Sequence, residues 1–514
     1  MRLVLGSSHT REQPGDVLPR LATTGSPALE LSLAGILAIA LTALPVGLHL
    51  IGQSVALAAD IAGAIVVASM WPRAIPVVVF VAYCLQSSFV SMTSSQVPTI
   101  QDMEPMKIYS FVTTAVIWLV TAARYANNLS AYSPFTHRLM LCTSAALALV
   151  GCFFVIGLLF DARGASIYMR NIGLPILLFQ TCLLVASKEV VMLRGVAGIV
   201  LGLLILCGYT EMLAVERWLD LTNGWVYWDK AFAYERESGI WIKRVQEGAQ
   251  VVTGVLDLLK SDFLNTNFFA SEGLTIVRLQ GPNFHSISFG YALAIFGSVL
   301  AIHGRILMPV IMTPLLLMAS AKGAIVLFIF SITFCFIARV RAHRFVWNGL
   351  LVVLCLFAVV AFISGLRTGD YHVLGLIGGV NGFLRNPFGH SLGQGGNLST
   401  NFAEVDWNAY QASGSSELAI ESAVGVLIFQ MGIAAIALLG LYFWLSKTAW
   451  RLYQTFGFSA LAWSSAAIAI ILVNGLFQEE ALFAPLAFAL ILAITGLAFG
   501  SLDRVVMSGQ LRGE

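Results

Sequence analysis

The sequence predicts an all-α protein that crosses a membrane many times. Of its 514 residues, 58% are hydrophobic and only 11% are Asp, Glu, Lys or Arg, whereas charged residues make up roughly 25% of an average soluble domain. The mean hydropathy is +0.84, and apolar runs long enough to span a bilayer, roughly 17–25 residues, recur along the chain. Lipid is therefore the main solvent expected for this protein.

About fourteen transmembrane runs can be recognised, within a range of about 12–14. The first, residues 28–51, is too long for the apolar part of a signal peptide and lacks a convincing cleavage site. The runs near 306 and 323 are short and could form a single broken or re-entrant element. The runs begin near residues 28, 54, 74, 107, 138, 170, 189, 284, 306, 323, 345, 416, 459 and 481.

The distribution of Lys and Arg predicts which side each connection faces. Basic residues accumulate in cytoplasmic connections, and the most basic short connection, residues 339–344, reads Arg-Val-Arg-Ala-His-Arg. Counting spans outward from it places both tails, 1–27 and 501–514, in the cytoplasm. Two acidic connections, 101–104 and 479–480, then face the opposite side, which agrees with an even number of spans.

This topology divides the chain into membrane segments and two long outer loops. The first loop, 208–282, is rich in Trp, and its apolar pattern at 242–259 predicts an amphipathic helix on the membrane surface. The second loop, 365–415, contains a stretch at 385–397 whose density of Gly predicts a tight turn. The membrane segments are an N-terminal bundle (28–207), central helices (283–364) and C-terminal helices (416–500).

The composition does not indicate a disulfide framework, a metal site or nucleic-acid binding. All seven cysteines lie inside apolar runs, where a thiol usually acts as a small hydrophobic group. The formal net charge is only +2, and neither an Asp-x-Asp metal motif nor a phosphate-binding P-loop is present. We therefore expect no metal, no other cofactor and no nucleic-acid partner.

Three cations are expected on the outer side. Arg278 ends the first outer loop, Lys322 lies at a turn between two apolar runs, and Arg367 opens the second loop. Any one of them could simply extend toward lipid headgroups. Charges near bilayer depth are costly, however, and usually mark function. Together these cations would suit a polyanionic, membrane-anchored ligand, because arginine and lysine form charge-assisted bonds with phosphates.

Proton-accepting groups are predicted beside these cations. Glu417 and Glu421 are four residues apart at the expected start of a helix near 416, which would put both on one helix face. His372 follows Arg367 in the second loop. A glutamate at a helix start can also serve only to complement the helix dipole, and a lone histidine in a loop is usually solvated.

These residues follow an order that resembles the O-antigen polymerase and ligase superfamily of bacterial envelope glycosyltransferases. That family shows an Arg-x-x-Gly element followed by Pro-Asn, a Ser-Arg-Gly element, an arginine opening the second outer loop, a glycine turn, and His-Asn at a helix start. The resemblance covers about residues 270–440. The corresponding residues are Arg278-Leu-Gln-Gly281-Pro282-Asn283, Ser320-Ala-Lys322-Gly323, Arg367, Pro387-Phe-Gly389, Gly393-Gln-Gly395 and Glu421-Ser422.

Two departures from the family pattern matter. Lys322 stands where arginine is usual, which keeps the charge but loses the two-pronged hydrogen bonding of a guanidinium. Glu421-Ser422 stands where ligase-like members have His-Asn. Because that histidine is the candidate base in the superfamily, its absence favours a polymerase over a ligase.

The resemblance implies a GT-C-like glycosyltransferase of the bacterial inner membrane. It would polymerise undecaprenyl-pyrophosphate-linked oligosaccharide repeats into O-antigen, capsule or exopolysaccharide on the periplasmic face, by inverting transfer without a metal. Arg278, Lys322 and Arg367 would bind the pyrophosphate, and Glu421 would be the base, with Glu417 and then His372 as further choices. The bilayer and a chain-length-regulating membrane protein are expected partners. The residues implied for the sugar cleft are Asn283, Gly393, Gly395, Asn397 and Trp228.

Other classes stay open at this point. An O-antigen ligase would transfer a finished lipid-linked polymer to an acceptor, and a peptidoglycan-type polymerase would use related chemistry. A secondary transporter can have a similar number of spans, but it would show an internal repeat and charges at the membrane midplane. The sequence shows no convincing repeat, and its outer charges lie beside two long loops.

Overall fold

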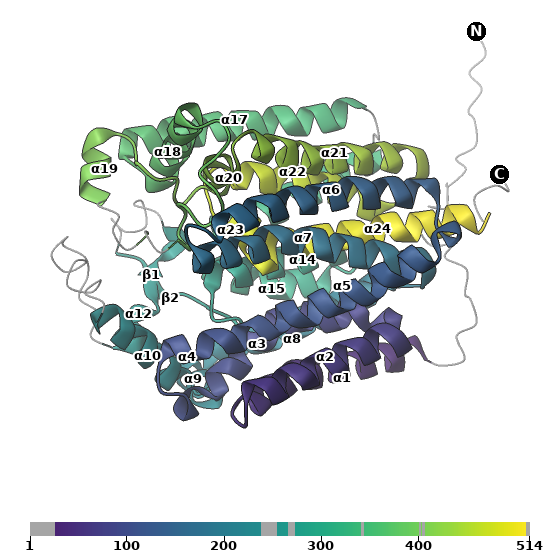
Figure 1. Cartoon of the computed structure of the whole chain (residues 1–514), viewed down its shortest axis with the longest axis horizontal. Coiled ribbons are helices and arrows are strands. Elements are labelled where there is room, and N and C mark those ends of the chain that lie inside the picture. The colour runs from purple at the N-terminus through teal and green to yellow at the C-terminus, as the bar shows by residue number, and fades with distance from the viewer. Residues whose placement is uncertain are drawn as a thin grey trace, which may run out of the picture.

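The protein is a bundle of roughly parallel helices (Figure 1). The computed structural model describes residues 26–237, 254–265, 273–340, 344–399, 402 and 407–509. Within these ranges eleven helices are long and apolar enough to cross a membrane, so the prediction of an all-α, multi-pass membrane protein is confirmed. They are α1 (Pro27–His49), α2 (Gln53–Met70), α3 (Ile75–Met92), α5 (Tyr109–Asn127), α6 (Pro134–Gly157), α7 (Ala162–Lys188), α8 (Leu193–Leu213), α16 (Lys322–Val340), α17 (Arg344–Thr368), α21 (Ile433–Phe456) and α24 (Leu490–Met507).

Three shorter apolar helices complete the bundle: α14 (Ser286–Ile302), α15 (Leu307–Met318) and α22 (Ser459–Asn474). With 12 residues, α15 is about 18 Å long at 1.5 Å per residue, which is shorter than the hydrocarbon core of a bilayer, roughly 30 Å. The short element predicted near residue 306 is therefore confirmed as a short helix, and α16 is a separate helix with 19 residues.

The centre of the bundle is formed by α7 and α24. These two helices and α3 are the most deeply buried of the eleven long apolar helices. Small residues let their backbones approach closely, as is common between helices in membranes. A Cβ atom added at Gly496 would lie 2.4 Å from the carbonyl oxygen of Phe179, and one at Gly500 would lie 2.4 Å from that of Leu183. Substituting either glycine would push the two helices apart.

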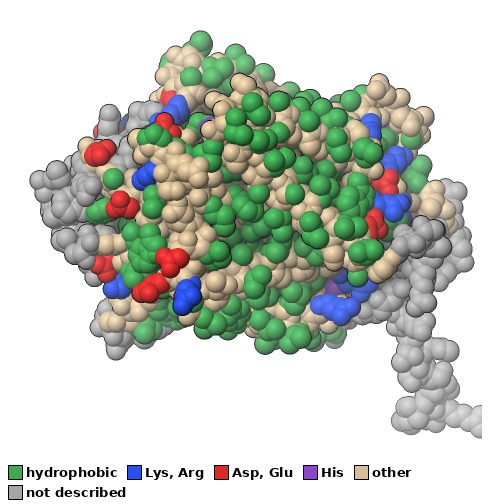
Figure 2. All heavy atoms as spheres, turned by 90° about the horizontal axis from the view of Figure 1, so that it is seen from below, with side chains coloured by type: hydrophobic (Ala, Val, Ile, Leu, Met, Phe, Trp, Pro, Cys, Tyr) green, Lys and Arg blue, Asp and Glu red, His purple; other side chains and the backbone are tan. Residues whose placement is uncertain are grey.

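Charged side chains gather at two opposite ends of the molecule, with a hydrophobic belt between them (Figure 2). We call one end the basic end, where α1 begins and α24 ends (Figure 1). Its turns are tied together: Trp71 bonds Glu30, and Ser133 bonds Asp503 through their side chains. We call the opposite end the loop end. The connections predicted to share one side of the membrane lie at the same end of the molecule.

Most of the remaining elements lie at the loop end, including helices inside both predicted outer loops. Residues 371–385 of the second loop form a regular helix, α18, and the glycine-rich stretch that follows it, 386–397, consists of turns and bends as predicted. The amphipathic helix predicted at 242–259 falls mostly outside the described residues. The loop-end elements are α4 (Ile100–Met103), α9 (Val215–Leu221), α10 (Gly224–Glu237), α12 (Val255–Leu258), β1 (Lys260–Asp262), β2 (Thr275–Val277), α18 (Tyr371–Arg385), α19 (Trp407–Ser413), α20 (Ala423–Met431) and α23 (Glu480–Phe483).

The two strands form a small antiparallel hairpin in which Ser261 lies opposite Ile276. Short turns of 3₁₀- or π-helix join several helices. They are η2 (Pro72–Ala74), η3 (Ser94–Gln96), η4 (Glu104–Ile108), η5 (Leu129–Ala131), η6 (Phe263–Asn265) and the π-turn η8 (Pro485–Ala489).

Candidate functional site

Unusual backbone conformations mark the loop end. Six described residues other than glycine have a positive φ angle, and all six lie at the loop end. Side chains rarely tolerate this conformation, and such residues often occur at functional sites. They are Asn223, Leu264, Phe284, Ser320, Ser391 and Glu421. Three of them belong to the predicted site segments. Phe284 lies six residues after Arg278, Ser320 lies two residues before Lys322, and Glu421 is itself a predicted site residue.

Arg278 is positioned by a turn that a buried carboxylate holds. Both oxygens of Glu211, at the end of α8, accept backbone N–H groups, from Gln280 over 2.8 Å and from Gly281 over 2.7 Å. Glu211 is 2% exposed, and these two hydrogen bonds offset the cost of burying its carboxylate. The turn directs Arg278 toward α15, where its Nε donates to the carbonyl oxygen of Ala319 over 2.9 Å.

Arg278 shares its surroundings with two groups from other segments. Burial lowers the pKa of Arg278, and the nearby carboxylate of Glu480 raises it. Burial also lowers the pKa of His285, while Glu480 raises it and Arg278 lowers it. Arg278, His285 and Glu480 therefore form one electrostatic group, although Glu480 is some 200 residues from Arg278 in the sequence.

Lys322 is brought to the same region by the start of α16. The carbonyl oxygen of Gly323 accepts a hydrogen bond from Asn474 Nδ2 over 2.9 Å, and Tyr291 donates to Gln478 over 2.8 Å beside it. A Cβ atom at Gly323 would lie 2.6 Å from the Gln478 side-chain oxygen, which shows how closely α16 approaches the turn after α22. The Lys322 side chain is exposed, and the Asp370 carboxylate interacts with it electrostatically.

The expected helix start near residue 416 is wrong. Residues 414–422 are irregular, α20 begins at Ala423, and Gly432 with φ 56° separates α20 from α21. The reason is a close backbone contact, because a Cβ atom at Gly375 of α18 would lie 1.7 Å from the carbonyl oxygen of Ile420. Glu417 and Glu421 therefore do not share a helix face, and Glu417 is exposed.

Glu421 is instead paired with His372 of α18. His372 Nδ1 lies 3.6 Å from Glu421 Oε2 and 3.2 Å from the Glu421 carbonyl oxygen. The Asp370 side chain caps α18 by accepting the His372 N–H over 2.9 Å. Burial raises the pKa of Glu421, the charge of His372 lowers it, and Glu480 raises it further. The predicted first and third choices of base are thus neighbours.

A second buried carboxylate, Glu479, lies behind Glu421. It accepts hydrogen bonds from the Tyr168 hydroxyl over 2.6 Å and from Asn397 N–H over 2.9 Å. The Asn397 side-chain oxygen in turn accepts the Glu421 N–H over 3.0 Å. Burial raises the pKa of Glu479 to about 8, against the lowering effect of these bonds. Asn397 thus connects the two carboxylates and has a positioning role.

Sequence reasoning missed the importance of Glu479 and Glu480. It treated them only as an acidic connection that helped to orient the chain. A pair of carboxylates in a short turn between two apolar spans is itself a signal, because charges so close to lipid are costly. Their neighbours Arg278, His285, Glu421 and Asn397 come from other segments, and only the folded structure reveals them.

The glycine turn of the second loop packs against the bundle. Gly393, with φ 92°, would place a Cβ atom 2.6 Å from the backbone nitrogen of Ala165. Gly395 accepts a hydrogen bond from Gln430 over 3.0 Å, and a Cβ atom at Gly396 would meet the Tyr168 hydroxyl. These glycines are buried, so the contacts show them shaping the site's backbone rather than offering an open surface.

The other predicted site residues, Arg367, Trp228 and Asn283, have no direct contact with the Glu421 carboxylate among the hydrogen bonds and ion pairs of the described residues. Arg367 is exposed at the end of α17, and it bonds no other residue within the described ranges. Trp228 packs against Tyr227 and Phe284 with ring centroids 5.5 and 6.0 Å apart, as part of a hydrophobic cluster. Asn283 bonds the carbonyl oxygen of His285 over 3.1 Å.

Comparison of the chain with protein-family models, with curated proteins and with solved structures finds no match. The assignment of a function therefore depends on the motifs and on the geometry of the loop end.

Proposed function

We propose that this protein is a polysaccharide polymerase of the bacterial inner membrane, which joins oligosaccharide repeats carried on undecaprenyl pyrophosphate. One observation carries the proposal: Glu421 lies 3.6 Å from His372 and is joined to Glu479 through Asn397, and the cations Arg278 and Lys322 interact electrostatically with Glu480 and Asp370 at the same end. The resemblance of these residues to the motifs of the O-antigen polymerase and ligase superfamily supports a glycosyltransferase of GT-C-like fold with a periplasmic site.

Arg278 and Lys322 would hold the pyrophosphate of the donor. In the structure the negative charge of Glu480 raises the pKa of Arg278. A pyrophosphate carries more negative charge than one carboxylate and would bind the guanidinium through charge-assisted hydrogen bonds. As the bond to the departing pyrophosphate breaks, charge grows on its oxygen, and preorganised cations stabilise that charge. Arg367, at the exposed end of α17, is the third candidate for this role.

Glu421 would act as the general base. A hydroxyl oxygen of the acceptor repeat attacks the anomeric carbon of the donor, and its proton passes to the Glu421 carboxylate. The electron pair of the broken C–O bond leaves with the undecaprenyl pyrophosphate, so the anomeric configuration inverts. A base works best when its pKa approaches the working pH, and burial shifts the pKa of Glu421 in that direction.

A ligase is the second candidate, and one contact favours it. The ligase-like members carry a histidine where this chain has Glu421, and here His372 lies 3.6 Å from that carboxylate. A histidine base is therefore available from α18, although it is absent from the motif position. The contact weakens the argument from sequence against a ligase, and the proposal needs an experiment that separates the two reactions.

The lipid-linked saccharides that accumulate in a strain lacking this protein provide that experiment. Loss of a polymerase should leave undecaprenyl pyrophosphate with single repeats, whereas loss of a ligase should leave it with long polymer. We expect single repeats, and complementation with the wild-type protein should restore long chains. Accumulated long polymer would assign the ligase reaction, and an unchanged lipid-linked pool would exclude both.

A further inference from the structure

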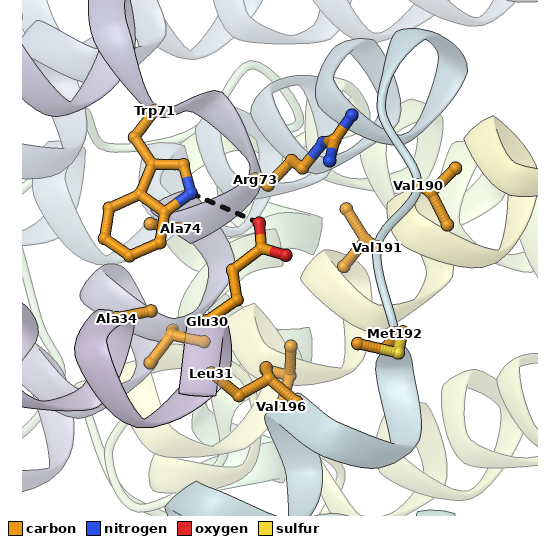
Figure 3. A pocket seen from close by; sticks show the side chains of 11 residues that line it. Glu30, Leu31, Ala34, Trp71, Arg73, Ala74, Val190, Val191, Met192 and Val196 are labelled. Atoms are coloured by element: carbon orange, nitrogen blue, oxygen red, sulfur yellow. Dashed lines mark hydrogen bonds between the residues drawn. The ribbon is translucent and has the colours of Figure 1, made fainter. Parts of the chain in front are cut away.

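A hollow at the basic end combines opposite charges with an apolar wall (Figure 3). It lies between the start of α1, the turn from α2 to α3 and the turn from α7 to α8. It holds about 350 Å³, counting the space at its open mouth. Glu30, Trp71 and Arg73 form its polar and aromatic part. The apolar wall includes Leu31, Ala34, Val77, Val191, Met192 and Val196.

The charges of Glu30 and Arg73 are held apart by separate partners. Trp71 Nε1 donates to Glu30 Oε1 over 3.4 Å, and Arg73 Nε donates to Glu189 Oε2 over 2.7 Å. Within the described part of the chain, the second oxygen of Glu30 and the terminal nitrogens of Arg73 make no hydrogen bond. Both side chains can therefore still form hydrogen bonds with a ligand.

Two guanidinium groups meet on the Arg73 side of the hollow. Arg504 of α24 interacts electrostatically with both Arg73 and Glu189, and Glu30 also acts on Arg73 across the hollow. The Nε atom of Arg504 is buried and has no hydrogen-bond partner among the described residues. This side can accept an anionic group, while Glu30 offers a place for a cationic one.

The position of the hollow in the bundle indicates where such a ligand comes from. Helix ends and a tryptophan surround it, and tryptophan side chains are enriched at membrane–water interfaces. The room that the hollow leaves for water-sized groups is only about 30 Å³, so a headgroup would contact it at its open mouth and a whole lipid would not enter. The acyl chains would remain in the bilayer beside the apolar wall.

We propose that this hollow binds the headgroup of a phospholipid that carries both a phosphate and a primary ammonium group, as phosphatidylethanolamine does. The phosphate lies at Arg73, and the ammonium donates N–H bonds to Glu30. Phosphatidylcholine keeps the positive charge but has no N–H donor. Phosphatidylglycerol has no cation to offer Glu30, so its phosphate meets an uncompensated carboxylate.

Binding by the delipidated full-length protein in detergent tests the proposal without any mutation. The ligands are phosphatidylethanolamine, its mono- and dimethyl derivatives and phosphatidylcholine, all with the same acyl chains, measured by native mass spectrometry. We expect affinity to fall along this series, with an overall loss of about fivefold, the factor that corresponds to roughly 1 kcal/mol. Equal affinity along the series would overturn the proposal.

Phosphatidylglycerol and free phosphoethanolamine complete the ligand panel. Tighter binding of phosphatidylglycerol than of phosphatidylethanolamine would mean a simple anion site and would contradict the role of Glu30. Free phosphoethanolamine should bind at least about tenfold more weakly than the lipid, because it cannot use the apolar wall. Equal binding of the two would show that the site takes a soluble phosphate ester and would overturn the assignment to a lipid.

Two variants test whether Glu30 and Arg73 bind the headgroup. Glu30→Gln keeps the shape and an acceptor for Trp71, and it should reduce the affinity for phosphatidylethanolamine to that for phosphatidylcholine. Arg73→Gln should weaken both lipids. Glu104→Gln is the control, because this carboxylate lies at the loop end and bonds Lys107 over 2.8 Å. An unchanged preference in Glu30→Gln, or an equal loss in the control, would refute the site.

Discussion

The two ends of this protein use the same residue types differently. At the basic end, charged side chains tie neighbouring turns to the backbone: Arg124 donates to the carbonyl oxygens of Ala68 and Ser69 at the end of α2. At the loop end, Arg278, Glu421 and Glu480 come from distant segments, and Glu480 acts electrostatically on both Arg278 and Glu421. A cation at a helix end is therefore not by itself a sign of function.

Backbone conformation separates the two ends as well. At the basic end, the described residues with positive φ are glycines, namely Gly304, Gly457 and Gly509. At the loop end, larger residues adopt this conformation, including Glu421 with φ 59°. Such conformations persist only when the surroundings enforce them. The loop end thus combines gathered charges with a constrained backbone, and both properties can be tested against the basic end.

The comparison predicts the largest difference for two arginines that both bond helix carbonyl oxygens. Arg278→Ala should reduce polymer formation by about 100- to 1,000-fold, the effect of removing a group that stabilises a developing oxyanion. Arg124→Ala should leave activity per folded molecule within about twofold and cost about 1 kcal/mol of stability. Activity is measured as chain length on gels, normalised to protein in the membrane. Equal losses in the two variants would remove the distinction between the ends.

Glu421 and Glu417, the first and second choices of base from the sequence, should differ in their effect on the rate of polymerisation. Glu421→Gln removes the proposed base and should lower the rate by about 100-fold or more. Glu417→Gln changes an exposed side chain and should stay within about twofold. The measurement is the initial rate of polymerisation with purified variants. A larger loss in Glu417→Gln than in Glu421→Gln would exchange their roles.

The glycine contact behind Glu421 offers a matched pair for stability. Gly375→Ala places a Cβ atom 1.7 Å from the Ile420 carbonyl oxygen, and such overpacking costs about 1–3 kcal/mol. Gly440→Ala, in α21, meets no atom within 4 Å and should be neutral or stabilise by up to about 1 kcal/mol. Thermal unfolding in detergent compares the two variants. A neutral Gly375→Ala variant would show that the backbone contact is not needed.

Stability should also depend on pH because of the buried carboxylate of Glu479. Its pKa is raised to about 8, so the folded state holds the proton more tightly than the unfolded state, where the value is 4.5. This stabilisation is complete below the unfolded pKa and is lost as the pH rises through about 8. The unfolding temperature should therefore fall between about pH 5 and pH 8 and level off above, with less of a fall in Glu479→Gln. A Glu479→Gln variant with the full wild-type fall would contradict the assignment, and Glu104→Gln is the control.

The membrane architecture could be predicted from the sequence because it depends on local hydrophobicity and length. The helix boundaries predicted from hydrophobicity were wrong where polar residues extend a helix and where a glycine interrupts one. The run predicted from residue 170 is part of α7, which begins at Ala162 because Asp161 caps it by accepting the Gly164 N–H over 2.9 Å. The apolar residues after 416 look continuous, but Gly432 interrupts them with φ 56°.

The candidate site could be predicted only in part. Arg278, Lys322 and Glu421 stood out because charges are rare in this chain. Their neighbours are set by tertiary contacts, so neither the pairing of Glu421 with His372 nor the role of Glu211 behind Arg278 could be derived from spacing. The irregular segment before α20 depends on Gly375, some 45 residues earlier, and no local pattern reveals that contact.

The central claim is that the charges at the loop end form one polymerising site, and reconstitution tests it most directly. Purified protein in liposomes would receive undecaprenyl-pyrophosphate-linked repeats extracted from the strain that lacks it, with EDTA present. We predict a ladder of longer chains for the wild type and the Arg124→Ala variant, and none for folded Arg278→Ala. A full ladder from Arg278→Ala, or none from the folded wild type, would contradict the claim.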